Sequence, residues 1–141
     1  MNTQPLAWTD TAKRRHGRNR RLVLQALARA HRPMGAYELL ELLREDGFSS
    51  PLQVYRALDQ LIRDGAVHKI ESLSAFALCS RQEGGCKGSA VFAICNRCGQ
   101  ASEIHDADLQ QILRRIALSQ GFETTAATVE LSGVCQGCAH G

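Results

Sequence analysis

Three segments in the first half of the chain repeat apolar residues at the three-to-four-residue spacing of an amphipathic helix. The pattern predicts helices over residues 13–30, 36–45 and 51–63. Ser50 and Pro51 fit the N-cap and the first turn of the third helix, because a serine oxygen can accept a free backbone N–H there and proline has none to satisfy. The first half is therefore expected to contain a three-helix unit.

Two short segments after the third helix are rich in residues that favour strands. Residues 66–71 and 74–79 are separated by a turn at Ser72 and Leu73, which predicts a β-hairpin. Three helices followed by a hairpin is the layout of a winged helix-turn-helix, in which the third helix enters the major groove of DNA.

The second half of the chain has a different pattern. Residues 91–94 and 101–104 are expected to be strands on either side of a Cys-x-x-Cys turn, and residues 124–131 a further strand. A helix is expected over residues 107–120, with a buried stripe made of Leu109, Ile112, Leu113 and Ile116. These elements predict a small α/β domain.

The fold class is therefore expected to be α+β, with two domains. The boundary falls in residues 80–88, which contain several glycines and charged residues and few apolar ones, as a hinge does. Residues 1–79 are the predicted winged-helix domain, and residues 89–141 are the predicted second domain.

Composition and charge indicate a soluble protein with a basic first helix. Hydrophobic residues make up 44% of the chain and charged residues 22%, as in an average globular protein. No apolar run reaches the roughly 18 residues of a membrane span, and no secretion signal is recognisable, so we expect a cytoplasmic protein. The net charge is +3. Much of the basic excess is one cluster, typical of a nucleic-acid contact or of a solvated helix face: Lys13, Arg14, Arg15, Arg18, Arg20 and Arg21.

Six cysteines in a cytoplasmic protein are better explained by metal binding than by disulfides. Four of them form two Cys-x-x-Cys knuckles, Cys95 with Cys98 and Cys135 with Cys138, each at the end of a predicted strand. Tetrahedral zinc takes four thiolates delivered as two such pairs, whereas a redox pair needs a thioredoxin-like context that the sequence lacks. We expect a structural zinc, which also stabilises a domain with a small core.

Further metal-capable side chains gather around the expected hinge. Cys79 and Cys86 bracket it, His68 lies on the predicted hairpin, and Glu103 and His105 follow the first knuckle. These residues either form a second metal site where the domains meet or are unrelated surface and core residues.

Four stretches of sequence occur in a recognisable order: GAYELL at 35–40, VYRAL at 54–58, VHKIES at 67–72 and ICNRCG at 94–99, followed by the distal cysteine pair. In this combination the chain resembles the ferric uptake regulator family, and within it the zinc-sensing branch. The resemblance covers nearly the whole chain.

The resemblance implies a zinc-responsive repressor with two Zn²⁺ per chain. One zinc would be structural, on the four knuckle cysteines, and the other regulatory, at the hinge, with His68, Cys79 and Glu103 among its ligands. The C-terminal domain would form a homodimer. With the regulatory zinc bound, the dimer would bind double-stranded operator DNA and control zinc uptake genes.

The fourth regulatory ligand departs from the family pattern. Zinc-sensing relatives commonly have a histidine seven residues before the first knuckle cysteine, and Gly88 occupies that place here. We predict that Cys86 supplies the missing ligand, because it lies two residues upstream in a glycine-rich segment. His105 is its rival, since it would share a strand face with Glu103.

The third helix carries the residues predicted to read bases. Arg56 is expected to contact a purine and Tyr55 the DNA backbone or a thymine methyl group, the alternative being that Tyr55 is only a core residue. Phosphate contacts are expected from the basic cluster, namely Lys13, Arg14, Arg15 and Arg18.

Other functions fit the sequence less well. An enzyme with catalytic zinc needs an open coordination position and a general base, and no His-Glu-x-x-His element occurs, so we expect neither catalysis nor a small-molecule substrate. The resemblance also disfavours another metal or peroxide sensor, because iron- and peroxide-sensing relatives tend to carry a His-rich stretch just upstream of the first knuckle, whereas residues 89–93 contain no ligand. Thiolate ligands also select zinc. A zinc-knuckle interaction module without DNA binding leaves the arginine-rich helix unexplained.

Overall fold

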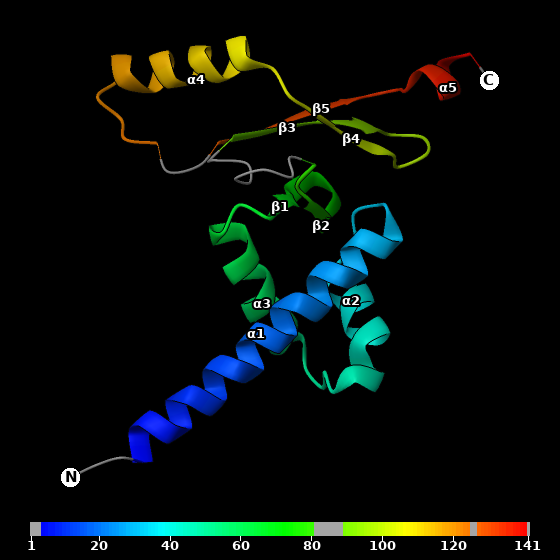
Figure 1. Ribbon diagram of the computed structural model, residues 1–141. Helices are drawn as coiled ribbons and strands as arrows, with labels where there is room; N and C mark the ends of the chain where they lie inside the picture. Colours follow the sequence, from blue (N-terminus) through cyan, green and yellow to red (C-terminus); the bar gives the residue numbers. More distant parts are fainter. Residues whose placement is uncertain (1–3, 81–88, 125–126, 141) are drawn as a thin grey trace. The chain divides into compact units, whose positions relative to one another are not determined.

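The computed structural model of the chain divides into two compact units, Met1–Leu78 and Cys79–Gly141, called unit 1 and unit 2 below (Figure 1). It describes the backbone of residues 4–80, 89–124 and 127–140, and within these ranges the side chains of residues 17–80, 90–124 and 127–140. Unit 1 is mainly helical and unit 2 contains a mixed sheet, so the predicted α+β class is confirmed.

Unit 1 contains the three expected helices, α1 (Gln4–Ala30), α2 (Ala36–Leu43) and α3 (Pro51–Arg63). The predicted start of α1 at residue 13 was too late, because the apolar repeat that signals a helix is present only where α1 packs on its neighbours; the helix continues beyond them toward the N-terminus (Figure 1). The end of α2 is a 3₁₀ turn, η1 (Arg44–Asp46), closed by Gly47 in the left-handed conformation at φ 102°.

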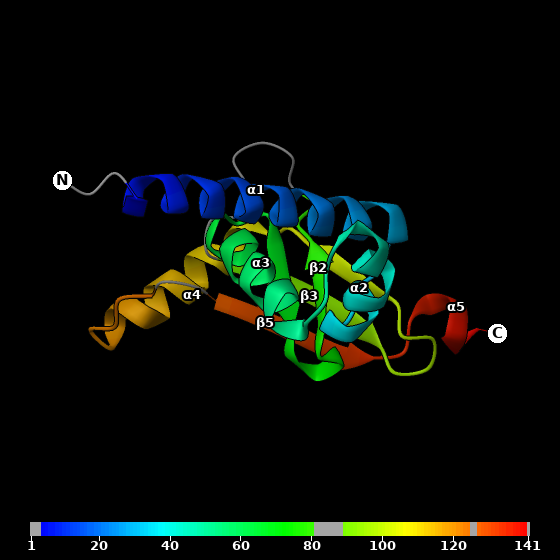
Figure 2. The ribbon, with the colours of Figure 1, turned by 90° about the horizontal axis from the view of Figure 1, so that it is seen from below.

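The helix α3 has the predicted bounds because its first turn is well capped. Ser50 is the N-cap, and Oε1 of Gln53 accepts a hydrogen bond from the backbone N–H of Ser50 at 3.2 Å, as in a capping box. Figure 2 shows α2 and α3 packed against α1. The buried side of α3 consists of Val54, Ala57, Leu58 and Leu61.

A two-stranded antiparallel hairpin completes unit 1. It consists of β1 (Val67–Ile70) and β2 (Ala75–Leu78), joined by the 3₁₀ turn η2 (Glu71–Leu73). Met34, between α1 and α2, pairs with Phe76 of β2 through two backbone hydrogen bonds of 2.9 and 2.8 Å. The hairpin is therefore tied to the helices, which confirms the winged helix-turn-helix layout.

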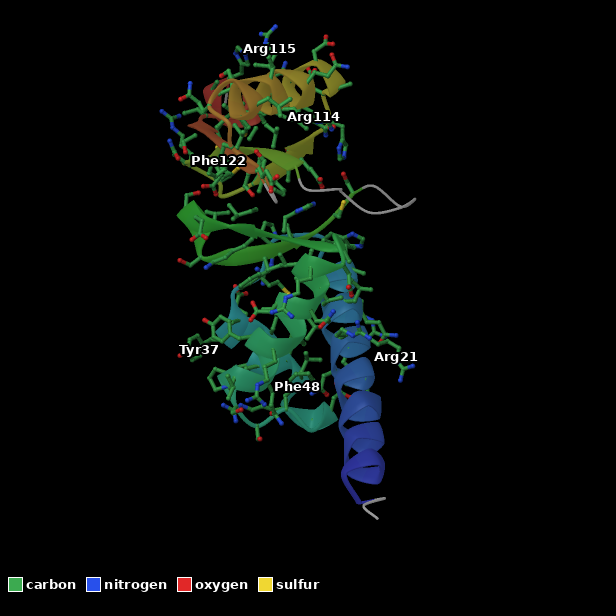
Figure 3. The ribbon with its side chains drawn as sticks, turned by 90° about the vertical axis from the view of Figure 1, so that its left-hand side faces the viewer. Arg21, Tyr37, Phe48, Arg114, Arg115 and Phe122 are labelled. Atoms are coloured by element: carbon green, nitrogen blue, oxygen red, sulfur yellow. The ribbon has the colours of Figure 1, made fainter. Side chains whose placement is uncertain are left out.

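One hydrophobic core holds unit 1 together, and a few apolar side chains remain outside it. Phe48 lies among the helices and is buried, whereas Tyr37 projects from α2 and is 67% exposed (Figure 3). The central part of the core comes from all three helices and the hairpin, with Val23, Leu27, Leu39, Leu43, Val54, Leu58, Val67 and Phe76 among its members.

The described residues of unit 2 form a three-stranded sheet and two helices, in the order β3 (Ser89–Cys95), β4 (Ala101–Ile104), α4 (Ala107–Ser119), β5 (Ala127–Gly133) and α5 (Gln136–Ala139). The strand β3 lies in the middle; it pairs antiparallel with β4 and parallel with β5. The strands β3 and β4 follow each other in the chain and form an antiparallel hairpin. The segment that contains α4 then connects β4 to β5 on the other side of β3.

The predicted burial of α4 was wrong. Among the described residues, α4 has no buried residue: Ile112 is 40% and Ile116 54% exposed, and Leu109 and Leu113 are only half-buried. Periodicity identifies an apolar face but not whether its partner belongs to the same chain. A contiguous apolar face left open in this way is typical of a protein–protein contact.

Within the part of the chain that the structure describes, no helix combines the length and the apolar character needed to cross a membrane.

We expect the open face of α4 to associate with a second copy of the chain. Ile116→Asp should convert the dimer into a monomer in sedimentation experiments, because it places a charge in a desolvated apolar contact. Arg114→Asp is the matched control, since Arg114 lies two residues from Ile112 and Ile116 and so points away from their face. A variant Ile116→Asp that stays dimeric would exclude this face from the interface.

Candidate metal centres and DNA-binding helix

Helix α3 exposes both of its residues that were predicted to contact DNA. Tyr55 is 41% exposed, and Arg56 is exposed beside it. The Tyr55 ring also packs edge-on against Phe76 of the hairpin, with ring centroids 6.5 Å apart. Tyr55 therefore contributes to the packing of unit 1 and still presents part of its ring to solvent.

The predicted phosphate contacts are described only in part. Arg18 is exposed, and its Nη1 donates a hydrogen bond to the backbone oxygen of Asp46 at 2.9 Å. Three further residues belong to α1 by their backbone, but their side chains lie outside the described residues: Lys13, Arg14 and Arg15.

The first cysteine knuckle is a tight turn at the end of β3. Gly99 closes it in the left-handed conformation at φ 77°, which favours glycine, and its N–H donates to the oxygen of Cys95 at 3.0 Å. The N–H of Cys95 donates in turn to the oxygen of Gln100 at 2.9 Å. The turn thereby directs the Cys95 and Cys98 sulfurs to one side.

The second knuckle meets the first because β3 and β5 are parallel neighbours in a fixed register. Cys95, the last residue of β3, is opposite Gly133, the last residue of β5. The chain continues from Gly133 to Cys135, which is the N-cap of α5, and α5 carries Cys138. The N–H of Asn96 also donates to the Gly133 oxygen at 2.7 Å. Both cysteine pairs are thus delivered to the same end of the sheet.

The four sulfurs fit a tetrahedral zinc ion. All four Sγ atoms lie within 4.8 Å of one another, and those of Cys98 and Cys135 are 3.8 Å apart. Zn–S bonds of about 2.3 Å give a tetrahedron whose edges are also roughly 3.8 Å. The candidate structural site therefore has the right ligands at the right spacing.

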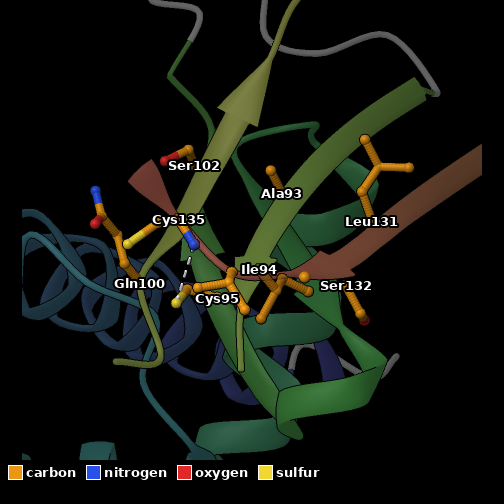
Figure 4. Close-up of a pocket in the computed structure, with 10 residues that line it drawn as sticks. Ala93, Ile94, Cys95, Gln100, Ser102, Leu131, Ser132 and Cys135 are labelled. Atoms are coloured by element: carbon orange, nitrogen blue, oxygen red, sulfur yellow. Dashed lines mark hydrogen bonds between the residues drawn. The ribbon is translucent and has the colours of Figure 1, made fainter. Parts of the chain in front are cut away.

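Two backbone N–H groups donate hydrogen bonds to the Cys95 sulfur and favour its thiolate form, which is the form that binds a metal. The N–H groups of Cys135 and Cys98 donate to the Cys95 sulfur at 3.3 and 3.5 Å, as Figure 4 shows for Cys135. These bonds stabilise the thiolate and lower the pKa of Cys95 to about 5. Hydrogen bonds between the Cys138 thiol and the neighbouring sulfurs, that of Cys135 first, stabilise its protonated form and raise the pKa of Cys138 to about 12, and repulsion by the negative charge of Cys135 adds a smaller effect. A cation at the centre would relieve that repulsion.

A second group of polar side chains lies in unit 2 around Glu103, whose side chain is only 6% exposed. The Cys79 sulfur is 3.9 Å and the His105 Nε2 3.8 Å from Glu103 Oε1. The N–H of Ser80 donates to Glu103 Oε2 at 2.8 Å, and the Ser80 hydroxyl lies 2.5 Å from His105 Nε2. Cys79 is disulfide-bonded, so its sulfur becomes a metal ligand only after reduction.

The other two predicted regulatory ligands are His68 and Cys86, of which the structure describes only His68. His68 lies on β1 of unit 1, where it pairs with Ala77 of β2, two residues before Cys79. Cys86 lies outside the described residues. Unit 2 thus brings together Cys79, Glu103 and the rival ligand His105.

Two residues that surround these centres were missed by sequence reasoning. Ser80 bonds Glu103 and adjoins His105, and Arg97 donates from its Nη1 to the oxygen of Cys138 at 3.2 Å. Serine and arginine are not zinc ligands, so a search for ligand spacing passes over them. The position of Arg97 inside the first knuckle was the available signal.

Comparison with known proteins agrees with these features. The model of the Ferric uptake regulator family matches residues 12–132 of the chain. The zinc uptake regulation protein of Escherichia coli (strain K12) is 37% identical over 117 residues, which span 82% of this chain and 68% of that protein.

Two solved structures are similar over most of their length. The crystal structure of holo XcZur has a TM-score of 0.77 and 41% sequence identity, covering 87% of this chain and 85% of that one. A zinc uptake regulator complexed with zinc and DNA has a TM-score of 0.78 and 29% identity, covering 99% of this chain and 97% of the other.

Replacing a knuckle cysteine should remove one zinc per chain and destabilise unit 2. Cys98→Ser or Cys135→Ser is expected to unfold or monomerise this unit, because zinc binding contributes on the order of 10 kcal/mol to the folding of such sites. Ser119→Ala, at the end of α4, is the control, since Ser119 belongs neither to the four-sulfur cluster nor to the predicted regulatory ligands. Zinc content by atomic emission and mass by light scattering would decide. A stable dimer that has lost this zinc would mean that the site is peripheral.

Proposed function

The chain belongs to the ferric uptake regulator family, and we propose that it is a zinc-responsive transcriptional repressor that controls zinc uptake genes. In this proposal a dimer binds operator DNA when a regulatory zinc is bound. The observation that carries the proposal is the combination, in one chain, of a winged-helix unit with an exposed Tyr55-Arg56 pair and a unit with a four-sulfur zinc cluster. The family match also points to a regulator rather than an enzyme.

The helix α3 is proposed to read the operator from the major groove. A guanidinium can donate two hydrogen bonds to the edge of a guanine, and the Arg56 side chain is exposed on α3. The proposed role of Tyr55 is a contact to the DNA backbone or to a thymine methyl group. The basic residues of α1, Lys13, Arg14, Arg15 and Arg18, are proposed to contact phosphates, which fix the register without reading sequence.

Each chain is proposed to bind two zinc ions with different roles. The structural ion would be held by the four sulfurs of Cys95, Cys98, Cys135 and Cys138. The regulatory ion would be held by His68, Cys79, Glu103 and either Cys86 or His105. Cys86 is our assignment for the fourth ligand, and the 3.8 Å distance between His105 Nε2 and Glu103 Oε1 supports the rival.

The regulatory zinc would act by fixing one arrangement of the two units. A ligand shifts such an equilibrium only by its preference for one state, and a preference of about 100-fold is worth roughly 3 kcal/mol. A repressor of chromosomal operators works in the cytoplasm, where thiols are kept reduced. That environment would supply Cys79 as a thiolate.

Ligand chemistry favours zinc over the related alternatives. Iron and manganese prefer harder oxygen and nitrogen donors, whereas thiolates select zinc. A zinc-knuckle module without DNA binding would leave the exposed Tyr55-Arg56 pair without a role.

A gel-shift experiment on the DNA upstream of the protein's own gene tests the function as a whole. We expect the protein to bind this DNA when zinc is present and to release it when a chelator is added. Binding that is the same with and without zinc would refute the proposal.

Removing the Arg56 guanidinium should weaken and relax operator binding. Arg56→Ala is expected to cost about 1–3 kcal/mol against the preferred base and to flatten the preference at that position. Fluorescence anisotropy on matched and mutated operators at one salt concentration measures both effects. Arg29→Ala, an exposed arginine near the end of α1, is the charge-matched control. Unchanged affinity and preference in Arg56→Ala would show that α3 does not read the DNA there.

The fourth regulatory ligand can be identified by comparing two variants under reducing conditions. If Cys86 is the ligand, Cys86→Ser should raise the zinc concentration needed for operator binding by at least tenfold, because one of four ligands is lost, while His105→Ala should respond nearly as the wild type does. Structural zinc is quantified in each sample so that unfolding is not mistaken for loss of sensing. A lost response in His105→Ala alone would reassign the ligand to His105.

A further inference from the structure

Arg97 links the two cysteine knuckles through its side chain. It is the residue before Cys98 in the first knuckle, and its Nη1 donates to the backbone oxygen of Cys138 in α5 at 3.2 Å. The last carbonyl groups of a helix have no partner within the helix. The short helix α5 uses the oxygens of Cys135 and Gln136 for its own bonds, so Arg97 reaches one of the carbonyls left over at its end.

The charge of Arg97 also suits its position. Four thiolates around one Zn²⁺ leave about two net negative charges on the site. A guanidinium stays protonated at any pH relevant to the protein and favours the C-terminal end of a helix, where carbonyl oxygens are exposed. The Arg97 guanidinium therefore suits the negative end of α5, which it contacts at the residue that carries the fourth sulfur.

Two other hydrogen bonds between the knuckles have backbone N–H donors. The N–H of Asn96 donates to the Gly133 oxygen, and the N–H of Cys135 donates to the Cys95 sulfur. Both hold the start of the second knuckle. The Arg97 bond acts at the other end of that knuckle, on the residue that carries the fourth sulfur.

We propose that Arg97 is a positioning residue that holds Cys138 in the structural zinc site and thereby slows the loss of zinc. The inference rests on the proposed structural zinc. It concerns how firmly the ion is retained, which is separate from zinc sensing and from DNA binding.

The test compares three zinc-loaded, full-length variants with the wild type: Arg97→Gln, Arg97→Lys and Arg114→Gln. The last removes the same charge from an exposed position on α4. Zinc release into an excess of a coloured chelator is followed after the more labile zinc has been removed. Loss of a residue that orients a metal ligand typically weakens the site by about 10- to 100-fold, so release should be about tenfold faster in Arg97→Gln, intermediate in Arg97→Lys and unchanged in Arg114→Gln.

Alkylation of the same samples separates positioning from general destabilisation. If Arg97 holds Cys138, iodoacetamide should modify Cys138 several-fold faster in Arg97→Gln, with little change at Cys95. A parallel rise at all four cysteines would overturn the proposal, as would a release rate equal to that of Arg114→Gln. If Arg97→Gln does not fold, Arg97→Lys decides by the same criteria. A wild type without tightly held zinc would refute the structural zinc itself, which distinguishes that failure from a failure of the Arg97 role alone.

Discussion

The parallel pairing of β3 with β5 is the constraint on which unit 2 depends. Because this register sets Cys95 opposite Gly133, the two knuckles begin at the same end of neighbouring strands. A shift by one residue would turn the Cys95 side chain to the other face of the sheet. Within the described residues, the buried apolar side chains of unit 2 apart from Cys79 all lie on β3. Such a small core benefits from a metal and from a partner subunit.

Local signals in the sequence were sufficient for most elements of the fold. The capping residues Ser50 and Pro51 and the apolar stripe around Leu58 gave the bounds of α3, and the spacing of the cysteines gave the four-sulfur cluster. The early start of α1 and the short helix α5 lack an apolar period, so nothing in the pattern marked them. The exposure of Ile112 and Ile116 is a property of the assembled surface, and periodicity alone does not contain it.

The candidate metal ligands could be predicted from the sequence because residue type and spacing identify them. Sulfur ligands in two close pairs identify a zinc site wherever the fold places them. By contrast, the bonds of Ser80 to Glu103 and of Arg97 to Cys138 depend on where the backbone turns, and such partners orient ligands without being ligands. These two hydrogen bonds can be identified only once the three-dimensional arrangement of the backbone is known.

The position of α3 on α1 depends on apolar packing more than on charge. This determines whether the arginines of α1 can leave their internal partners to contact DNA phosphates. Arg20 of α1 pairs with Asp64 at the end of α3 at 3.1 Å, but both side chains are well exposed, and an exposed ion pair contributes at most about 1 kcal/mol. Val23, Leu27 and Leu58 are almost fully buried between the same helices. The position of α3 on α1 therefore does not depend on the arginines. Arg18 and Arg20 could thus exchange a weak internal bond for a phosphate contact without displacing α3, the helix that we propose reads the operator.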